Sequence, residues 1–290
     1  MKKLILVLLS LALLLQPMMA LAEDASADWQ NILLLGCDTK TSEGYDRSDT
    51  MIVVSVNAKT NQIKMTSLMR DIWVHIQGYG EQKLNAATVF GGPDLAISTI
   101  NKNFGLDIEK YAMINISGMI DLVNALGGID VEIDQEELEY INNNVEEHTR
   151  YVGSDADLGE PIAAPGLAHL NGAQAVCHAR NRTTGQGDYS RTERQRNVLM
   201  AIANKVKNES SLLTVLAVIK ELLGFVETNL SLDDLMALAA VGFNADLSSV
   251  EQLRLPVDGT YKTGYVGEYW CIQPNFEQNA KLLYDFIYGE

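Results

Sequence analysis

The sequence contains few cysteines and histidines and only one long apolar run in its 290 residues. Its three cysteines are too few for a disulfide scaffold, and their odd number leaves at least one thiol unpaired in a monomer. The four histidines are scattered and no CxxC motif is present, so a histidine or cysteine metal site is not expected. A single apolar run excludes a protein that crosses the membrane several times.

Positive charge is also scarce, because 22 Lys and Arg stand against 38 Asp and Glu, for a formal net charge of −16. A surface with this charge repels nucleic acid, so we expect no nucleic-acid partner. Taken alone, the charge argues against any polyanionic partner. Apolar residues make up 47% of the chain and charged residues 21%, which is typical of a globular protein that buries a core.

Residues 1–22 have the features of an export signal. Lys2 and Lys3 precede the apolar run 4–15, and Ala20-Leu21-Ala22 matches a cleavage site with small residues. A run this short is marginal for crossing about 30 Å of hydrocarbon. Both a cleaved signal peptide and an uncleaved N-terminal anchor therefore remain open, and we expect an extracytoplasmic protein of the cell envelope, secreted or membrane-anchored.

The rest of the chain alternates between strand and helix patterns. Short apolar or alternating runs predict strands at 31–35, 51–56, 62–68, 111–116, 129–133 and 253–257, with the second and third forming a hairpin. Amphipathic patterns predict helices at 94–104, 119–126, 190–206, 211–225, 232–243 and 276–288. The polar segment 134–165 predicts an excursion and a loop. This alternation indicates an α/β layered domain, and no linker divides the chain.

Arginine is concentrated in one short window, since five of the nine arginines lie between residues 180 and 196. If the segment after Ala175-Val176-Cys177 is extended, Arg180 and Arg182 share a face. Two parallel guanidinium groups cost free energy unless an anion lies between them. The pattern therefore predicts an anion site.

A predicted helix begins close to the same window. Ser190 and Glu193 have the spacing of a capping box, and Arg191, Arg194 and Gln195 then lie on one helical face. A helix N-terminus already favours anions, so arginines there strengthen the prediction. The alternative is a solvated basic face with surface salt bridges, and Arg194 could pair with a carboxylate.

Carboxylates and further arginines lie at the ends of the first three predicted strands. Asp38 follows the first strand, and Arg47 and Asp49 precede the second. Carboxylates in such positions can hold Mg²⁺, which prefers one or two of them together with phosphate oxygens and water. Hydrogen bonds within turns are an equally good explanation for both aspartates. Arg70-Asp71 forms either an ion pair or another phosphate contact.

Together these motifs resemble the LytR-CpsA-Psr family of cell-wall glycopolymer transferases. The matching pieces, in order, are NILLLGCD (31–38), RSDTMIVVSVN (47–57), SLMRD (67–71), KLNAATVFGGPDLAISTI (83–100), DLVNALGGIDVEI (121–133), LNGAQAVCHARNR (170–182) and DYSRTERQRNVL (188–199). Met69 stands where the family commonly has proline. The short N-terminal segment also differs from the membrane anchor that is usual in the family.

The resemblance implies a single catalytic domain at 28–290, with an α-β-α layered fold around a central mixed β-sheet. It implies a phosphotransferase that moves a glycopolymer, such as teichoic acid or capsule, from a polyprenyl-pyrophosphate carrier to a muramic-acid hydroxyl of peptidoglycan. Asp38 and Asp49 would hold Mg²⁺, and the catalytic residues would be Arg70, Arg180, Arg182 and Asp71. Further pyrophosphate contacts would come from Arg47, Arg191, Gln195, Lys83 and Asn85.

Several alternatives remain open at this level. Asp71 could orient an arginine or take the proton of the acceptor. The apolar helices 94–104, 119–126 and 211–225 could line a lipid groove or form ordinary core. The same arginines and Mg²⁺ would also serve a polyprenyl-pyrophosphate pyrophosphatase, and a non-enzymatic envelope protein that binds lipid or regulates would show binding without turnover.

Overall fold

The computed structural model describes residues 28–38, 40–41, 44–149, 157–208 and 211–289. The predicted export segment 1–22 lies outside the described residues. No helix in the described part of the chain is both long and apolar enough to span a bilayer.

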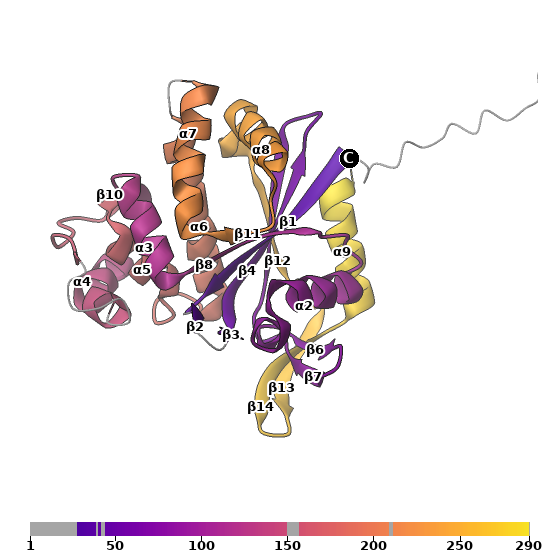
Figure 1. The fold of residues 1–290 in the computed structure, drawn as a ribbon. Coiled ribbons are helices and arrows are strands. Elements are labelled where there is room, and N and C mark those ends of the chain that lie inside the picture. The colour runs from indigo at the N-terminus through magenta and orange to yellow at the C-terminus, as the bar shows by residue number, and fades with distance from the viewer. Residues whose placement is uncertain (1–27, 39, 42–43, 150–156, 209–210, 290) are drawn as a thin grey trace, which may run out of the picture.

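A mixed six-stranded sheet forms the centre of the domain (Figure 1), as expected. In spatial order its strands are β11 (Glu227–Thr228), β8 (Lys110–Asn115), β1 (Trp29–Cys37), β4 (Ser48–Asn57), β5 (Gln62–Leu68) and β12 (Glu251–Leu255). The pairs β1–β8 and β5–β12 are parallel, while β1–β4, β4–β5 and β8–β11 are antiparallel. The predicted hairpin of the second and third strands is therefore confirmed.

Helices cover both faces of this sheet (Figure 1), which gives the predicted α-β-α layers. Helices α2 (Ala86–Phe104) and α9 (Phe276–Tyr288) pack on one face, and α6 (Asp188–Lys207), α7 (Leu212–Leu222) and α8 (Leu232–Asn244) lie on the other side. Because both faces are covered, consecutive residues of the central strands are buried, such as Ile32 and Leu33 in β1 and Ile52 and Val53 in β4. A short 3₁₀ turn, η2 (Leu223–Phe225), follows α7, and η3 (Leu247–Ser249) follows α8.

A smaller group of elements packs against α6 with an apolar core of its own. It contains α3 (Ile116–Ala125), β9 (Ile129–Ile133), α4 (Gln135–Thr149), β10 (Gly166–Leu170) and α5 (Gly172–Arg180). Helix α4 corrects the prediction of a loop at 134–165. Asp134 and Glu137 cap its first turn reciprocally, and Leu138 and Ile141 bury one side of it. The acidic composition of the segment concealed that stripe.

Other boundaries differ from the predictions in ways that the backbone explains. Helix α2 begins eight residues before the predicted start at Asp94 and bends at Gly91 and Gly92, whose dihedral angles are not helical. Helix α8 begins at the predicted capping box, in which Ser231 and Asp234 satisfy each other's backbone N–H groups. The bounds of α9 are those predicted.

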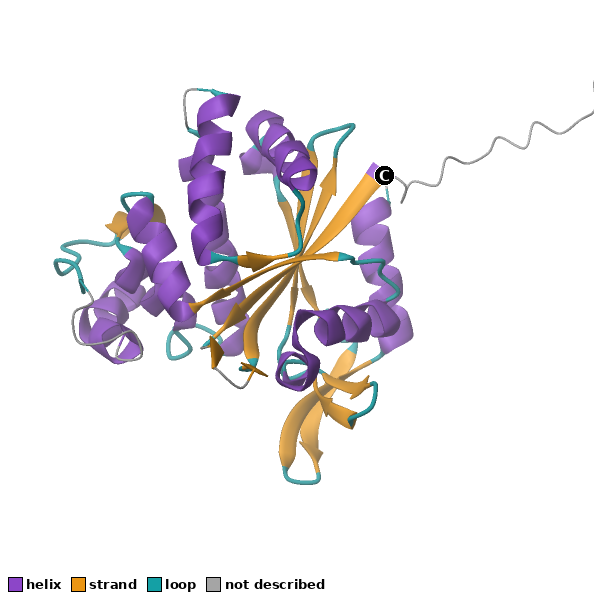
Figure 2. Cartoon of the chain, viewed as in Figure 1, coloured by secondary structure: helices purple, strands orange, loops and turns teal. Residues whose placement is uncertain are grey.

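Several short strands were not predicted. They form the hairpins β2 (Lys40–Thr41) with β3 (Gly44–Tyr45), β6 (Trp73–Ile76) with β7 (Gly80–Lys83), and β13 (Tyr261–Val266) with β14 (Tyr269–Pro274). The last hairpin extends beyond the sheet at the bottom of the view in Figure 2. It lies next to β6, because Ile72 and Ile272 form a parallel bridge.

Candidate active site: an arginine-rich cavity

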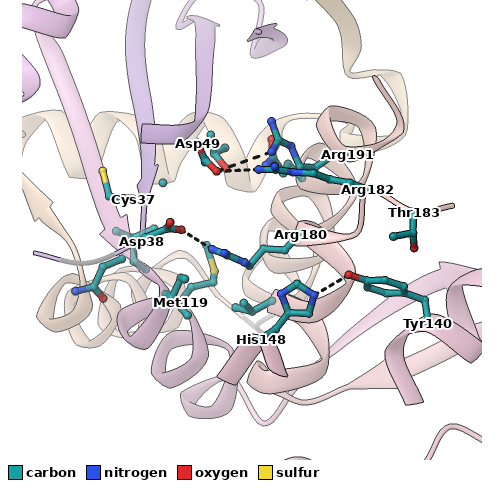
Figure 3. Close-up of a pocket in the computed structure, with 18 residues that line it drawn as sticks. Cys37, Asp38, Asp49, Met119, Tyr140, His148, Arg180, Arg182, Thr183 and Arg191 are labelled. Carbon is teal, nitrogen blue, oxygen red and sulfur yellow. Dashed lines mark hydrogen bonds and ion pairs between the residues drawn. The ribbon is translucent and has the colours of Figure 1, made fainter. Parts of the chain in front are cut away.

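A cavity of about 380 Å³ opens where β1 ends, β4 begins and the first turns of α6 approach (Figure 3). Asp38 lies just beyond β1 and Asp49 lies at the start of β4. Arg180 and Arg182 reach the cavity from the end of α5, and Arg191 reaches it from α6. The remaining wall is largely apolar and includes Ile114, Ile116, Met119 and Val176. One cavity thus combines a cationic end with an apolar wall.

Asp49 lies at the centre of the arginines. Arg70 Nη1 donates to both of its carboxylate oxygens at 2.8 and 2.7 Å, and Arg182 Nη2 donates at 2.9 Å. Arg191 Nη1 lies 3.9 Å away. Burial of Asp49 opposes its ionisation, but the hydrogen bonds and charge of Arg70, followed by the charges of Arg191 and Arg182, outweigh it and lower the pKa of this carboxyl.

Arg191 is 3% exposed, and only some of its N–H groups have partners among the described residues. Its Nη2 lies 3.3 Å from Asp188, but neither Nε nor Nη1 makes a hydrogen bond within the described residues. Burial, followed by the nearby charge of Arg70, lowers the pKa of Arg191 to about 10. Buried donors without partners are rare in proteins, so these N–H groups are suited to an anionic ligand.

Arg180 forms a second ion pair at the mouth of the cavity. Its Nη1 lies 2.5 Å from Asp38 Oδ1, and its Nε is buried without a hydrogen bond in the described part of the chain. The two arginines do not share an extended segment, so that prediction was wrong. Arg180 ends α5, which begins at a capping box between Asn171 and Gln174, and Arg182 follows the C-cap. The turn at that helix end, rather than a strand, directs both side chains into the cavity.

The start of α6 also differs from its prediction. The helix begins at Asp188 after Gly187, whose φ of 64° is left-handed, and Ser190 Oγ accepts from the backbone of Gln186 instead of capping the helix. Arg191 and Gln195 line the cavity, whereas Arg194 does not. The predicted common face of these three residues is therefore divided between two roles.

Arg194 holds the loop that carries Arg182. Its Nε lies 2.5 Å from Glu137, its Nη1 donates to the carbonyl of Asn181 at 3.2 Å, and its Nη2 donates to Thr184 Oγ1 at 2.6 Å. The side chain is 6% exposed. It therefore joins α6, α4 and the loop after α5, and it pairs with a carboxylate.

Replacing Arg194 with leucine is expected to destabilise the protein by about 3 kcal/mol, the lower end of the range for a broken buried pair, because the Glu137 carboxylate, 12% exposed, is left without its partner. Thermal or urea unfolding measures this change. The double variant Arg194→Leu with Glu137→Leu should recover at least half of the loss, since it removes the orphaned charge as well. Equal destabilisation in the single and double variants would contradict the pairing.

Five predicted site residues do not line the cavity, and the first of them, Arg70, is linked to it through Asp49. Asp71 is buried, 2.6 Å from Lys83 Nζ and 3.4 Å from Arg70 Nε, so Lys83 fixes Asp71 and Asp71 in turn pairs with Arg70. Asn85 Nδ2 lies 3.5 Å from Asp49 Oδ1. Arg47 is exposed and its side chain makes no hydrogen bond or ion pair among the described residues, so the structure does not bring it to the cluster.

Comparison with known proteins shows to which family the chain belongs. A model of the LytR_cpsA_psr family matches residues 15–284. The chain belongs to this family. The Enterococcus faecalis protein named polyisoprenyl-teichoic acid–peptidoglycan teichoic acid transferase TagU is 35% identical over 240 residues, which cover 81% of this chain and 72% of the relative. A Streptococcus mutans relative named biofilm regulatory protein A is 32% identical, over 79% of this chain and 57% of its own length.

Solved structures of the LytR_cpsA_psr family share the whole architecture. B. subtilis TagV superposes with a TM-score of 0.71 at 27% identity, covering 90% of this chain and 97% of TagV. A TagT structure described as containing bound octaprenyl pyrophosphate lipid superposes with a TM-score of 0.66 at 26% identity, covering 92% of this chain and 93% of TagT. The predicted family and fold class are therefore confirmed.

Some residues that line the cavity or contact its arginines were not predicted from the sequence. Asp188, which contacts both Arg182 Nε at 3.4 Å and Arg191 Nη2, precedes Arg191 by one helical turn, and that spacing could have identified it. Tyr140 and His148 line the cavity from α4 and share a hydrogen bond of 2.7 Å (Figure 3). They fell in the segment taken for a loop. Burial, followed by the charge of Arg180, lowers the pKa of His148.

The two predicted metal ligands are compatible with Mg²⁺. Asp38 and Asp49 both line the cavity, and no group of three or more His, Cys, Asp or Glu side chains in the described part of the chain forms a complete metal cage. Mg²⁺ commonly takes one or two carboxylates and completes its shell with phosphate oxygens and water. The donor set therefore suits a metal that arrives with a phosphorylated substrate.

Proposed function

We propose that this protein transfers a glycopolymer phosphate from a polyprenyl-pyrophosphate carrier to a hydroxyl of peptidoglycan. The observation that carries the proposal is the convergence of Arg70, Arg182 and Arg191 on Asp49, a carboxylate that lines the cavity with the apolar wall. Within the described residues, buried N–H groups of Arg70 and Arg191 have no hydrogen-bond partner. Arginine forks match the geometry of phosphate oxygens. The relatives named as teichoic acid transferases support the same donor and acceptor.

The apolar wall would hold the first isoprene units of the carrier lipid. Met119 and Ile116 belong to α3, one of the helices for which core and groove were both open, and both side chains line the cavity. Helix α2 and the buried apolar residues of α9 instead form one continuous core with the sheet. The bound octaprenyl pyrophosphate described for TagT supports this use of the wall.

The proposed reaction is an in-line displacement at the phosphorus that carries the glycan. The acceptor hydroxyl oxygen forms a bond to this phosphorus, the bond to the bridging oxygen breaks, and polyprenyl phosphate leaves with that electron pair. The transition state of phosphoryl transfer is loose and gains most from positioning and charge stabilisation, so the hydroxyl proton can pass to water in the open cavity. Arg180, Arg182 and Arg191 would stabilise the charge on the phosphate oxygens.

In this scheme the remaining residues have supporting roles. Asp38 and Asp49 would hold Mg²⁺, which would supply further charge stabilisation at the pyrophosphate. Arg70 would be held in place by Asp71, which Lys83 fixes in turn, and this favours orientation over proton transfer as the role of Asp71. Gln195 would add a neutral contact. The enzyme would act on the outer side of the cytoplasmic membrane, where its substrates meet.

The proposal is tested with purified protein, a synthetic polyprenyl-pyrophosphate glycan and purified peptidoglycan as the acceptor. Release of polyprenyl phosphate that requires the protein, Mg²⁺ and peptidoglycan, and that stops in the presence of EDTA, is the expected result. Binding of the donor with no turnover under these conditions would contradict an enzymatic role. It would favour a regulatory role, and two relatives are named as regulatory proteins.

A larger side chain in the apolar wall is expected to weaken binding of the lipid end of the donor and to leave binding of its pyrophosphate end unchanged. The variant Met119→Trp should weaken binding of octaprenyl pyrophosphate by about tenfold or more, since filling a packed apolar site typically costs about 1–3 kcal/mol. Binding of inorganic pyrophosphate, which needs only the arginines, should stay within twofold of wild type. Calorimetry measures both affinities, and equal loss of the two would argue against a lipid-binding wall.

A further inference from the structure

A second cavity, of about 470 Å³, lies between the first turns of α6 and the chain that follows β12. Tyr189 and Arg196 line it from α6, and Arg254, Asp258 and Tyr261 line it from the other side. It differs from the arginine-rich cavity in having almost no aliphatic lining.

The two cavities are neighbours through shared stretches of chain. Asp188 contacts the arginines of the first cavity, and the next residue, Tyr189, lines the second. On the other side, Arg70 binds Asp49, while the residue before it, Met69, has its sulfur 3.6 Å from Arg254 Nη1. A ligand in the second cavity is therefore close to the proposed reaction centre.

The second cavity presents aromatic rings and balanced charges. Arg254 lies over the ring of Tyr189 at 4.1 Å from its centroid and pairs with Asp258 at 2.6 Å, and the hydroxyls of Tyr189 and Tyr261 are hydrogen-bonded. Two arginines, at 196 and 254, are matched by two carboxylates, at 193 and 258. A second phosphate would meet both carboxylates, so the lining suits a neutral polar ligand.

Arg196 retains a donor for such a ligand. Its Nε donates to Gln252 at 2.6 Å and its Nη1 donates to Ser67 at 2.7 Å. Within the described residues its Nη2 has no hydrogen-bond partner. The guanidinium is thus fixed by two bonds and offers the remaining N–H groups to the cavity that it lines.

An aromatic face continues from this cavity along the β13–β14 hairpin. Because side chains alternate in a strand, Tyr265 shares a face of β13 with Tyr261, and Trp270 stands directly opposite Tyr265 in the register. Tyr265 is 74% exposed and Trp270 is 41% exposed. On the other face of the hairpin, Tyr269 stacks with Trp73 of β6 and stays 56% exposed.

We propose that the second cavity and this aromatic face bind the acceptor glycan, as a chain of neutral N-acetylhexosamine rings. Such rings present C–H groups that pack on aromatic faces, with hydroxyl and amide groups at their edges for arginine, carboxylate and tyrosine partners. The cavity holds the sugar next to the arginine cluster, and the hairpin holds the sugars that follow. This inference rests on the proposed function, because it assigns the acceptor of the same reaction.

The test measures binding of a soluble, uncross-linked peptidoglycan fragment of four sugars to the full chain by calorimetry. Arg254→Ala should weaken binding about tenfold, corresponding to about 1.4 kcal/mol. Tyr265→Ser, at an exposed position that does not threaten folding, should weaken it about threefold. Lys281→Ala is the matched control, because Lys281 and Asp285 form an i, i+4 ion pair like that of Arg254 and Asp258 but do not line the cavity.

Inorganic pyrophosphate should bind all three variants as it binds wild type. Unchanged fragment affinity in both Arg254→Ala and Tyr265→Ser would overturn the inference even if transfer is observed. Weaker fragment binding in these variants, in a protein that never transfers glycan, would support the glycan site while removing the proposed reaction. The variant Arg182→Ala separates the two claims further, since it should bind the fragment normally.

Discussion

Replacing Arg182 with alanine is expected to lower the rate of glycan transfer by about 10³-fold or more, the range seen when a charge-stabilising arginine is removed from a phosphoryl-transfer site. Arg182 donates to Asp49 at 2.9 Å and reaches the same cavity as Arg180 and Arg191. Its side chain is 42% exposed, so its loss should change the free energy of unfolding by less than about 1 kcal/mol. Steady-state kinetics and thermal unfolding of the same preparation check both expectations.

The conservative variant Arg182→Lys makes this test sharper. Lysine keeps the charge but lacks the planar guanidinium, which can donate two parallel hydrogen bonds to a phosphate. If these paired hydrogen bonds are required, Arg182→Lys should recover no more than about a tenth of the rate that Arg182→Ala loses. Lys281→Ala, at an exposed ion pair on α9, should transfer at the wild-type rate. Equal turnover in wild type and Arg182→Ala would contradict the assignment of the site.

The variant Asp49→Asn is expected to show the second largest effect, a loss of about 10²-fold or more in transfer. The carboxylate would hold the metal during the reaction, and in the unliganded protein it neutralises Arg70, Arg182 and Arg191. Its removal leaves three guanidinium groups close together, with only the longer contacts to Asp188 and Asp71 as counter-charge. We expect a stability loss of about 1–3 kcal/mol, less than for a fully buried pair because Asp49 is 21% exposed.

An anion should reverse this loss of stability. Without Mg²⁺, inorganic pyrophosphate should raise the melting temperature of Asp49→Asn more than that of wild type, since it replaces the missing charge without competing against a carboxylate. With Mg²⁺ the order should invert, because only wild type keeps both proposed metal ligands. Identical responses to Mg²⁺ in the two proteins would contradict the assignment of Asp49 as a ligand.

The same carboxylate predicts a dependence of stability on pH. The arginines lower the pKa of Asp49 in the folded protein below its value in the unfolded chain. Its contribution to stability is therefore fully present above the unfolded value, near 3.8, and is lost as the pH falls through the folded value. Wild type should lose its stability advantage over Asp49→Asn below about pH 4, as unfolding curves at several pH values would show.

The local signals of the sequence predicted most of the fold. The capping box of Ser231 and Asp234 lies within one helical turn and the stripe of α9 within one helix of 13 residues, so a short window contains all of their information. Helix α4 was not predicted because its many acidic residues obscure its short apolar stripe, although Asp134 and Glu137 mark its start. The edge hairpins are too short for a periodic pattern and depend on contacts made after folding.

The site was predictable in its composition but not in its pairing. Clustering of arginine in a chain of net charge −16 identified Arg180, Arg182 and Arg191, although the reason given for the first two was wrong. The partners Asp49 and Glu137 lie 133 and 57 residues from Arg182 and Arg194, a separation that spacing arguments cannot cover. The low abundance of positive charge thus describes the surface as a whole and conceals one local cationic cavity.

The fate of the transferred phosphate tests the central claim most directly. The donor would carry one radiolabel in the phosphate next to the sugar, and purified peptidoglycan with Mg²⁺ would serve as acceptor. We predict that the label becomes covalently bound to peptidoglycan in wild type and not in Arg182→Ala. Recovery of all the label as free glycan phosphate, at the same rate with and without peptidoglycan, would contradict transfer and identify the protein as a pyrophosphatase.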